Sequence, residues 1–212
     1  MNEKHIEYIK NLGLNIDDNK ISLLDAFAEL VWQKKDDVNI TSVKTKDEIY
    51  TRHLLDGAVG VSVINTLTPN VINILDAGAG SGYIGIVIKI LLGNKVNVIL
   101  AESVNRKCVF MNWAIIKLGL KNIKILNYRL TEAEPNKKFD IVIQRAMGKI
   151  DDILPICSVF VANGGYFLSY LAEETFADDN LLQKLNMELI RDRKYPLPDS
   201  DKQRKIAIYK KN

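Results

Sequence analysis

The stretch DAGAGSGYIG (residues 76–85) places four glycines within ten residues. An apolar run (71–78) leads into the start of this stretch and is typical of a buried parallel strand. A second apolar run (82–93) follows and is typical of a helix. Glycine between a strand and a helix permits a tight turn and lets the backbone come close to a ligand. The stretch therefore predicts a binding turn at the end of the first strand of an α/β fold.

Strand and helix patterns continue to alternate after this turn. The alternation predicts a doubly wound, mainly parallel Rossmann-like sheet of about seven strands, with helices on both faces. The last two strands have no helix between them, which predicts an antiparallel edge. The expected strands are 71–78, 95–103, 122–129, 139–146, 164–172, 186–198 and 204–211. The expected helices are 82–93, 105–120 and 150–163, the last of them broken around Pro155.

The first part of the chain has a helical pattern. Residues 21–35 space their apolar side chains on one helical face, and Ser22 is the expected N-cap. Residues 36–46 are expected to form a polar loop with one extended piece, and residues 47–65 a second helix. No Gly/Ser-rich linker follows, so we expect residues 1–69 to be a helical extension that packs on a main domain of residues 70–212.

Composition limits the classes of protein that the chain can represent. Its 212 residues carry a net charge of +3, which permits a nucleic-acid partner without requiring one. Two distant cysteines favour a reducing compartment, and two histidines give no metal-ligand spacing. There is no signal-peptide pattern, and the most apolar run is too short to span a bilayer. We expect a cytoplasmic monomer with no metal and no membrane contact.

The spacing of the glycines indicates which ligand the turn would bind. Dinucleotide sites use G-x-G-x-x-G to face a pyrophosphate, whereas Gly78, Gly80 and Gly82 give G-x-G-x-G, with Tyr83 next. Asp76 before the turn would repel a phosphate but could hold a positively charged amino-acid head. Glu102, at the end of the second strand, could accept both hydroxyls of a ribose. S-adenosylmethionine fits this pattern best; the alternative is that the glycines only pack the helix on the sheet.

Several further segments resemble one family of methyltransferases. DAGAGSGYIGI resembles the first motif of class I methyltransferases. NITSVKTKDEIYTRHLLDG (39–57) is similar to the preceding segment of the bacterial small-subunit (16S) rRNA guanine-N7 methyltransferases, the RsmG or GidB family. The order of the later segments is similar too: ESVNRKCVFMNWA (102–114), YRLTEAE (128–134), FDIVIQRAMGKIDDIL (139–154) and LPDSDKQRKIAIYKK (197–211).

The resemblance implies roles for individual residues. Gly78 and Tyr83 match cofactor contacts, and Leu130 and Thr131 match the pair beside the adenine. Arg145 matches an arginine beside cofactor and target base, while Arg129 and Arg204 match arginines of the RNA and catalytic face. The expected cofactor-binding residues are Asp76, Gly78, Gly80, Gly82, Tyr83, Glu102, Leu130, Thr131 and Arg145, and the expected catalytic residues are Arg129, Arg145 and Arg204.

Three positions depart from the family pattern. Ile84 stands where the family usually has proline, and Thr131 stands where it usually has an acid. Ser169 stands where it usually has a lysine, which is a candidate for the catalytic face.

The resemblance implies methyl transfer from S-adenosylmethionine to guanine N7 in 16S rRNA. Guanine N7 carries a lone pair and no proton, so this transfer needs alignment of the reacting atoms and no general base. Two alternatives stay open at this point. One is a methyltransferase acting on a small molecule or a protein, and the other is a non-catalytic RNA-binding descendant.

Overall fold

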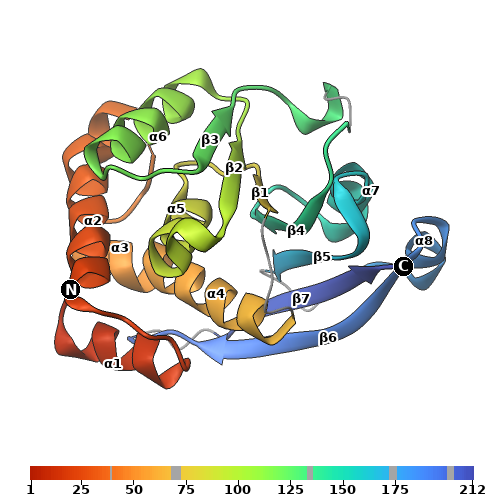
Figure 1. Ribbon diagram of the computed structural model, residues 1–212, viewed down its shortest axis with the longest axis horizontal. Helices are drawn as coiled ribbons and strands as arrows, with labels where there is room; N and C mark the ends of the chain where they lie inside the picture. The colour runs from red at the N-terminus through yellow and green to blue at the C-terminus, as the bar shows by residue number, and fades with distance from the viewer. Residues whose placement is uncertain (39, 68–72, 133–135, 172–175, 200–202) are drawn as a thin grey trace.

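One seven-stranded sheet runs through the protein in the order β3-β2-β1-β4-β5-β7-β6 (Figure 1). The computed structural model describes residues 1–38, 40–67, 73–132, 136–171, 176–199 and 203–212. The strands are β1 (Asn73–Ala77), β2 (Asn97–Ala101), β3 (Ile123–Leu126), β4 (Phe139–Arg145), β5 (Val161–Leu171), β6 (Met187–Pro196) and β7 (Gln203–Lys211).

The direction of the strands confirms the expected fold class. The pairs β1–β2, β2–β3, β1–β4 and β4–β5 are all parallel. Strand β7 pairs with β5 on one side and with β6 on the other, antiparallel to both. It therefore lies inside the sheet, and β6 forms the edge. The strand order reverses between β1 and β4, which is where ligands bind in open α/β sheets.

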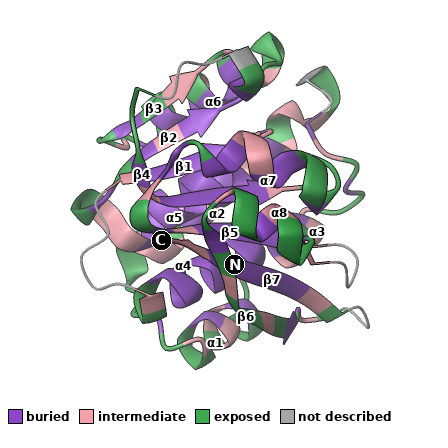
Figure 2. Cartoon of the chain, turned by 90° about the vertical axis from the view of Figure 1, so that its right-hand side faces the viewer, coloured by how far each residue is buried: buried purple, intermediate pink, exposed green. Residues whose placement is uncertain are grey.

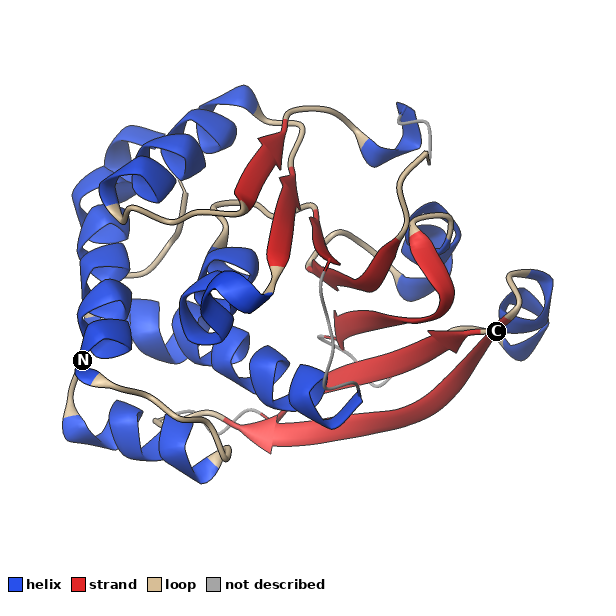
Figure 3. Cartoon of the chain, viewed as in Figure 1, coloured by secondary structure: helices blue, strands red, loops and turns tan. Residues whose placement is uncertain are grey.

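Helices cover both faces of the sheet (Figure 3). They are α1 (Glu3–Asn11), α2 (Asp18–Val38), α3 (Asp47–Ile49), α4 (Leu55–Leu67), α5 (Tyr83–Leu92), α6 (Asn105–Lys117), α7 (Ile150–Ser158) and α8 (Asp179–Lys184), with short turns η1 (Tyr50–Leu54), η2 (Gly93–Lys95) and η3 (Leu130–Glu132). Helices α4, α5 and α6 lie on one face and α7 and α8 on the other, while α2 packs outside α5 and α6. No helix among the described residues has both the length and the apolar character that crossing a membrane requires.

Alternating side chains of the strands form two cores. Ile74 and Ile143 belong to the core beneath α4, α5 and α6, whereas their neighbours Leu75 and Val142 belong to the core beneath α7 and α8. All four are buried, as are most residues of the central strands (Figure 2). Burial on both faces explains why these strands are continuous apolar runs in the sequence.

Two boundaries in the first part of the chain differ from expectation. Helix α2 begins at Asp18, so the Ser22 cap is wrong. Asp17 Oδ1 accepts a hydrogen bond from the backbone N–H of Lys20 (2.8 Å), as an N-cap carboxylate does. The helix also continues to Val38, so residues 36–38 of the expected loop are helical, and residues 40–46 contain no strand. The Asn39–Thr41 motif is described only at Ile40 and Thr41, because residue 39 lies outside the described residues.

Two further differences concern the later part of the chain. The expected helix 150–163 ends at Ser158 and passes through Pro155 unbroken, and β5 begins at Val161. The backbone N–H of Phe139 donates to the carbonyl of Phe160 (2.8 Å), which joins this segment to β4. Helix α8 and the turn η3 were not predicted. Residues 71, 72 and 172 of the expected strands, and the boundary at residues 69 and 70, lie outside the described residues.

Helix α4 approaches α5 closely because it carries Gly57. A Cβ added at Gly57 would lie 2.6 Å from Val87 Cβ and 3.3 Å from the backbone oxygen of Tyr83, both in α5. A π-helical turn, η1, connects α3 to α4 within the expected helix 47–65. Close packing of α4 on α5 therefore fixes the N-terminal helices against the helix that follows the glycine turn.

We predict that Gly57→Ala destabilises the protein, although alanine is the better helix former. The gain in helix propensity is about 1 kcal/mol, and overpacking a close contact costs about 1–3 kcal/mol. Since the clash involves a Cβ and a backbone oxygen, we expect a net loss of about 1–2 kcal/mol in urea unfolding. Asn65→Ala, at an exposed position of the same helix, serves as the control and should gain about 0.5 kcal/mol. A stabilised Gly57→Ala variant would contradict the packing argument.

Candidate functional site

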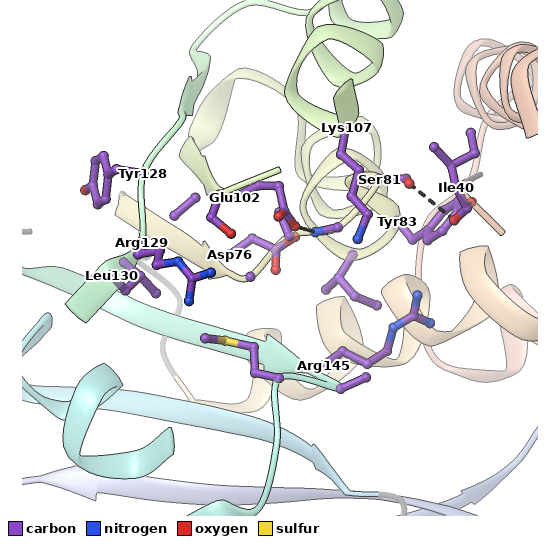
Figure 4. Close-up of a pocket in the computed structure, with 18 of the residues that line it drawn as sticks. Ile40, Asp76, Ser81, Tyr83, Glu102, Lys107, Tyr128, Arg129, Leu130 and Arg145 are labelled. Carbon is purple, nitrogen blue, oxygen red and sulfur yellow. Dashed lines mark hydrogen bonds between the residues drawn. The ribbon is translucent and has the colours of Figure 1, made fainter. Parts of the chain in front are cut away.

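A cavity of about 560 Å³ lies at the carboxyl ends of β1, β2, β3 and β4 (Figure 4). Its walls include the segment after each of these strands, and Ile40 and His53 are added from the N-terminal part of the chain. The cavity therefore occupies the point where the strand order reverses.

Most of the residues predicted for the site line this cavity. They are Asp76, Gly78, Gly80, Tyr83, Glu102, Arg129, Leu130, Thr131 and Arg145. Gly82 and Arg204, although described, are not among the lining residues. Gly82 (φ +78°) is the N-cap residue of α5, and a Cβ there would meet Ile86 and Met111, so this glycine serves the packing of the helix.

The glycine turn leaves room for a ligand at Gly80. Its φ is +60°, and a Cβ built there meets no atom within 4 Å. The backbone N–H of Gly80 donates to Glu102 Oε2 (2.9 Å), and the N–H of Val104 donates to Oε1 (2.8 Å). These bonds hold the carboxylate at the wall of the cavity, and a carboxylate has further acceptor capacity for ribose hydroxyls. The glycine turn and Glu102 thus fit a nucleoside: its ribose could bind Glu102 while the ligand approaches the backbone at Gly80.

Asp76 is buried at the base of the cavity. Its Oδ2 accepts a hydrogen bond from the backbone N–H of Gly85 (2.8 Å). Burial raises the pKa of Asp76 to about 7, although this bond and the charge of Arg145 act in the opposite direction. An acid with a pKa near neutrality can gain a negative charge when a cation binds beside it.

Asp56 connects two of the predicted arginines. The carboxylate is 1% exposed, and its Oδ2 accepts from Nη1 of Arg145 (2.8 Å) and from Nη1 of Arg204. Its Oδ1 accepts from the hydroxyl of Tyr195 (2.8 Å). Arg204 is therefore joined to the site through Asp56, without lining the cavity itself.

Aromatic and polar groups meet on the N-terminal side of the cavity. The rings of His53 and Tyr83 stack with their centroids 4.0 Å apart and their planes at 6°. The Tyr83 hydroxyl donates to the carbonyl of Ile40 (3.3 Å), as does Ser81 Oγ (3.3 Å). Burial, aided by the nearby Arg145, lowers the pKa of His53 to about 3. The segment around Ile40 is thereby tied to the glycine turn.

The backbone after β4 is strained where it borders the cavity. Ala146 has a φ of +61°, which is uncommon for a residue other than glycine. Gln144 supports this turn, since its Oε1 accepts from the backbone N–H of Met147 (3.2 Å) and its Nε2 donates to Ser169 Oγ (2.6 Å). Ser169, in the position of the family lysine, is fully buried and serves this support.

Comparison with known proteins identifies the family. The family model described as "GidB: rRNA small subunit methyltransferase G" matches residues 20–206. The chain belongs to this family. A Lachnoclostridium phytofermentans protein named ribosomal RNA small subunit methyltransferase G is 28% identical over 99% of this chain and 89% of its own length. A protein of the same name from Pseudothermotoga lettingae is 29% identical over 94% of this chain and 87% of its own length.

Solved structures of other methyltransferases share the fold of this GidB-family chain. Magnesium protoporphyrin IX methyltransferase from Synechocystis PCC 6803, solved with bound SAM, has a TM-score of 0.61 and 14% identity, covering 93% of this chain and 99% of that one. The Bacillus subtilis tRNA methyltransferase TrmK has a TM-score of 0.58 and 16% identity, covering 72% and 65%. These comparisons confirm the expected class I fold, the expected family and the expected enzyme class, which is methyltransferase.

Sequence reasoning missed several residues of the site. His53, Ser81, Lys107, Tyr128 and Met147 line the cavity and were not predicted to do so. His53 lies inside one of the segments that carried the family resemblance, so motif membership was an available signal. Ser81 lies within the glycine turn itself. Among the described residues, no three His, Cys, Asp or Glu side chains are grouped as a metal site.

We predict that Asp56→Asn strongly destabilises the protein. The substitution leaves two partly buried guanidinium groups without their carboxylate, and breaking a buried ion pair from one side costs about 3–5 kcal/mol. Urea unfolding should measure this loss. The matched control is Asp36→Asn, which removes a carboxylate that is 85% exposed and paired with Lys35, and should cost at most about 1 kcal/mol. Equal effects of the two substitutions would refute the role given to Asp56.

Proposed function

We propose that the protein transfers a methyl group from S-adenosylmethionine to N7 of a guanine in 16S ribosomal RNA. The observation that carries the proposal is that the cavity presents both carboxylates and cations. Asp76 and Glu102 lie at the ends of β1 and β2, Arg129 follows β3, Arg145 ends β4, and Lys107 adds a cation from α6. A cationic cofactor suits the carboxylates, and a polyanionic substrate suits the arginines.

The described residues around the glycine turn fit S-adenosylmethionine. Glu102 is suited to the ribose, and the open side of Gly80 admits a close ligand. Leu130 and Thr131, in the turn after β3, would border the adenine, and Gly78 and Tyr83 would complete the cradle. S-adenosylmethionine supplies an electrophilic methyl group on a positively charged sulfur.

The protein's own residues would act by orientation. The lone pair of N7 forms the new N–C bond while the C–S bond breaks and its electron pair stays on sulfur, so no proton is transferred. Arg145 borders the cavity and can donate to O6 or to a neighbouring phosphate while N7 stays free. Arg129 and Arg204 would bind phosphates. Asp56 neutralises only one of its two arginine partners, which leaves net positive charge for RNA.

The remaining assignments follow from this function. We infer that residues 70–212 form the methyltransferase domain and that residues 1–69 are a helical extension of it. The cavity draws on both parts, through Ile40 and His53. A 16S rRNA substrate implies a cytoplasmic location and a partner that is either the RNA or the small ribosomal subunit. We propose that the protein acts as a monomer.

We predict that purified protein methylates small-subunit RNA from cells that lack it, and that the product is 7-methylguanosine by mass spectrometry. Gly80→Arg should reduce methylation and calorimetric binding of S-adenosylmethionine to background, because the new side chain would compete for the ligand's space. Gly119→Arg is the matched control. Its φ of +62° and open surroundings resemble those of Gly80, but it lies outside the cavity. A protein that binds the cofactor and forms no 7-methylguanosine would disprove the proposed substrate.

We predict that the affinity for S-adenosylmethionine increases as the pH rises towards 7. The pKa of Asp76 is raised to about 7, so below that pH the carboxyl group must lose a proton to gain the charge that a cationic ligand favours. The linkage allows up to about a tenfold change in affinity per pH unit. Calorimetry between pH 5.5 and 7 should measure it, and Asp76→Asn should remove the dependence. A pH-independent wild-type affinity would rule out this role of Asp76.

A further inference from the structure

His53 lines the cavity and makes polar contacts at both ring nitrogens. Its Nδ1 lies 3.3 Å from Nη2 of Arg145, and its Nε2 lies 2.8 Å from Oγ1 of Thr41. The ring face is covered by Tyr83. These contacts fix the orientation of the imidazole from three directions.

The partners of the ring decide which nitrogen carries the proton. A guanidinium group has donors and no acceptor, so the contact with Arg145 requires an unprotonated Nδ1. A neutral imidazole then carries its proton on Nε2, which donates to Thr41 Oγ1. Thr41 Oγ1 also accepts from the backbone N–H of Val43 (3.3 Å).

The surrounding charges keep this ring neutral. Burial lowers the pKa of His53 to about 3, and the charges of Arg145, Arg204 and Arg52 act in the same direction, whereas the backbone of Arg52 acts weakly in the opposite one. The lone pair of Nδ1 is engaged by Arg145, so it is not available to take a proton from a substrate. This agrees with a reaction that needs no general base.

The same contact restricts Arg145. Its Nη1 donates to Asp56 Oδ2 (2.8 Å) and to the carbonyl of Arg52 (3.2 Å), while Nη2 faces His53. Three of the five N–H groups of a guanidinium are thus engaged, on two different nitrogens, which fixes both the position and the plane of the group. Asp56 and Arg52 both bind Nη1, and the guanidinium carbon lies 5.6 Å from the centroid of the Tyr83 ring, so His53 adds the contact that holds the second terminal nitrogen, Nη2.

We propose that His53 is a positioning residue for Arg145: as a neutral imidazole protonated on Nε2, it holds Nη2 and completes the set of contacts that orient the guanidinium towards the methyl acceptor. This role of His53 rests on the proposed function only in that the methyl acceptor is taken to be a guanine of 16S rRNA. It predicts that loss of the Nδ1 acceptor misaligns Arg145 and slows methyl transfer, while the binding of S-adenosylmethionine is unchanged.

The tautomer can be measured without any activity assay. The sequence contains two histidines, so ¹⁵N-histidine NMR of the whole protein gives two imidazoles, and His5→Asn identifies the signals of His53. We expect an unprotonated Nδ1 and a protonated Nε2 from pH 5 to 8, and a shift of the Nδ1 signal in Arg145→Ala. The proposal would be overturned if His53 were an imidazolium in this pH range, if it were protonated on Nδ1 instead of Nε2, or if its Nδ1 signal did not shift in Arg145→Ala.

Kinetics test whether His53 acts through Arg145. His53→Leu should lower the single-turnover rate by about 10- to 100-fold, the effect of losing a hydrogen bond to a charged group, with cofactor affinity within about twofold of wild type. His53→Asn retains a short acceptor and should recover most of the rate. In an Arg145→Ala background, His53→Leu should have no further effect. His5→Asn, at the other buried histidine, should leave the rate unchanged.

The outcomes separate this proposal from the proposed function. An equal loss from His53→Leu in both backgrounds, or a loss of cofactor binding, would show that His53 does not act through Arg145. The wild type could prove inactive on 16S rRNA and still show the expected Nδ1 signal, with the expected shift in Arg145→Ala. That result would refute 16S rRNA as the substrate and uphold the contact between His53 and Arg145.

Discussion

The buried carboxylate of Asp56 is the constraint on which the arrangement of the site depends. It lies in α4 and accepts bonds from Arg145 at the end of β4, Tyr195 in β6 and Arg204 in β7. The hydroxyl of Tyr170 in β5 donates to its backbone carbonyl (2.8 Å). A carboxylate this deeply buried is tolerated only when it is fully bonded, so β4, β6 and β7 must present their donors together for α4 to dock.

The docking of α4 makes the N-terminal helices part of the cavity. Because Gly57 lets α4 pack against α5, the turn η1 brings His53 over Tyr83. The carbonyl of Ile40 then accepts bonds from Ser81 and Tyr83, on either side of the start of α5. The glycine turn is therefore enclosed by a segment that lies more than thirty residues earlier in the sequence.

The sequence predicted the parts of the site that are local in the chain. The glycine turn and Glu102 follow directly from a strand–turn–helix pattern, because parallel strands end at the same edge of the sheet, and the family resemblance added the residues after β3. The contacts of Asp56 could not be predicted in this way, since they join residues up to 148 positions apart through side-chain geometry. Family resemblance placed Arg204 on the catalytic face, but only packing reveals that it acts on Arg145 through a shared carboxylate. The end of α7 was misjudged because an apolar run near Val161 suits a helix or a strand equally well.

The distribution of charge also bears on product release. Methylation of N7 places a positive charge on the guanine and leaves a neutral thioether where the cofactor carried a cation. In the proposed complex the base would face Arg145, whose charge is only partly balanced because Asp56 is shared with Arg204. Asp76 would then face a product with one positive charge fewer, since the sulfonium charge is lost and the ammonium group of the amino-acid end stays, and its raised pKa lets it take up a proton more readily near neutral pH. Both walls of the cavity therefore interact less favourably with the products than with the reactants.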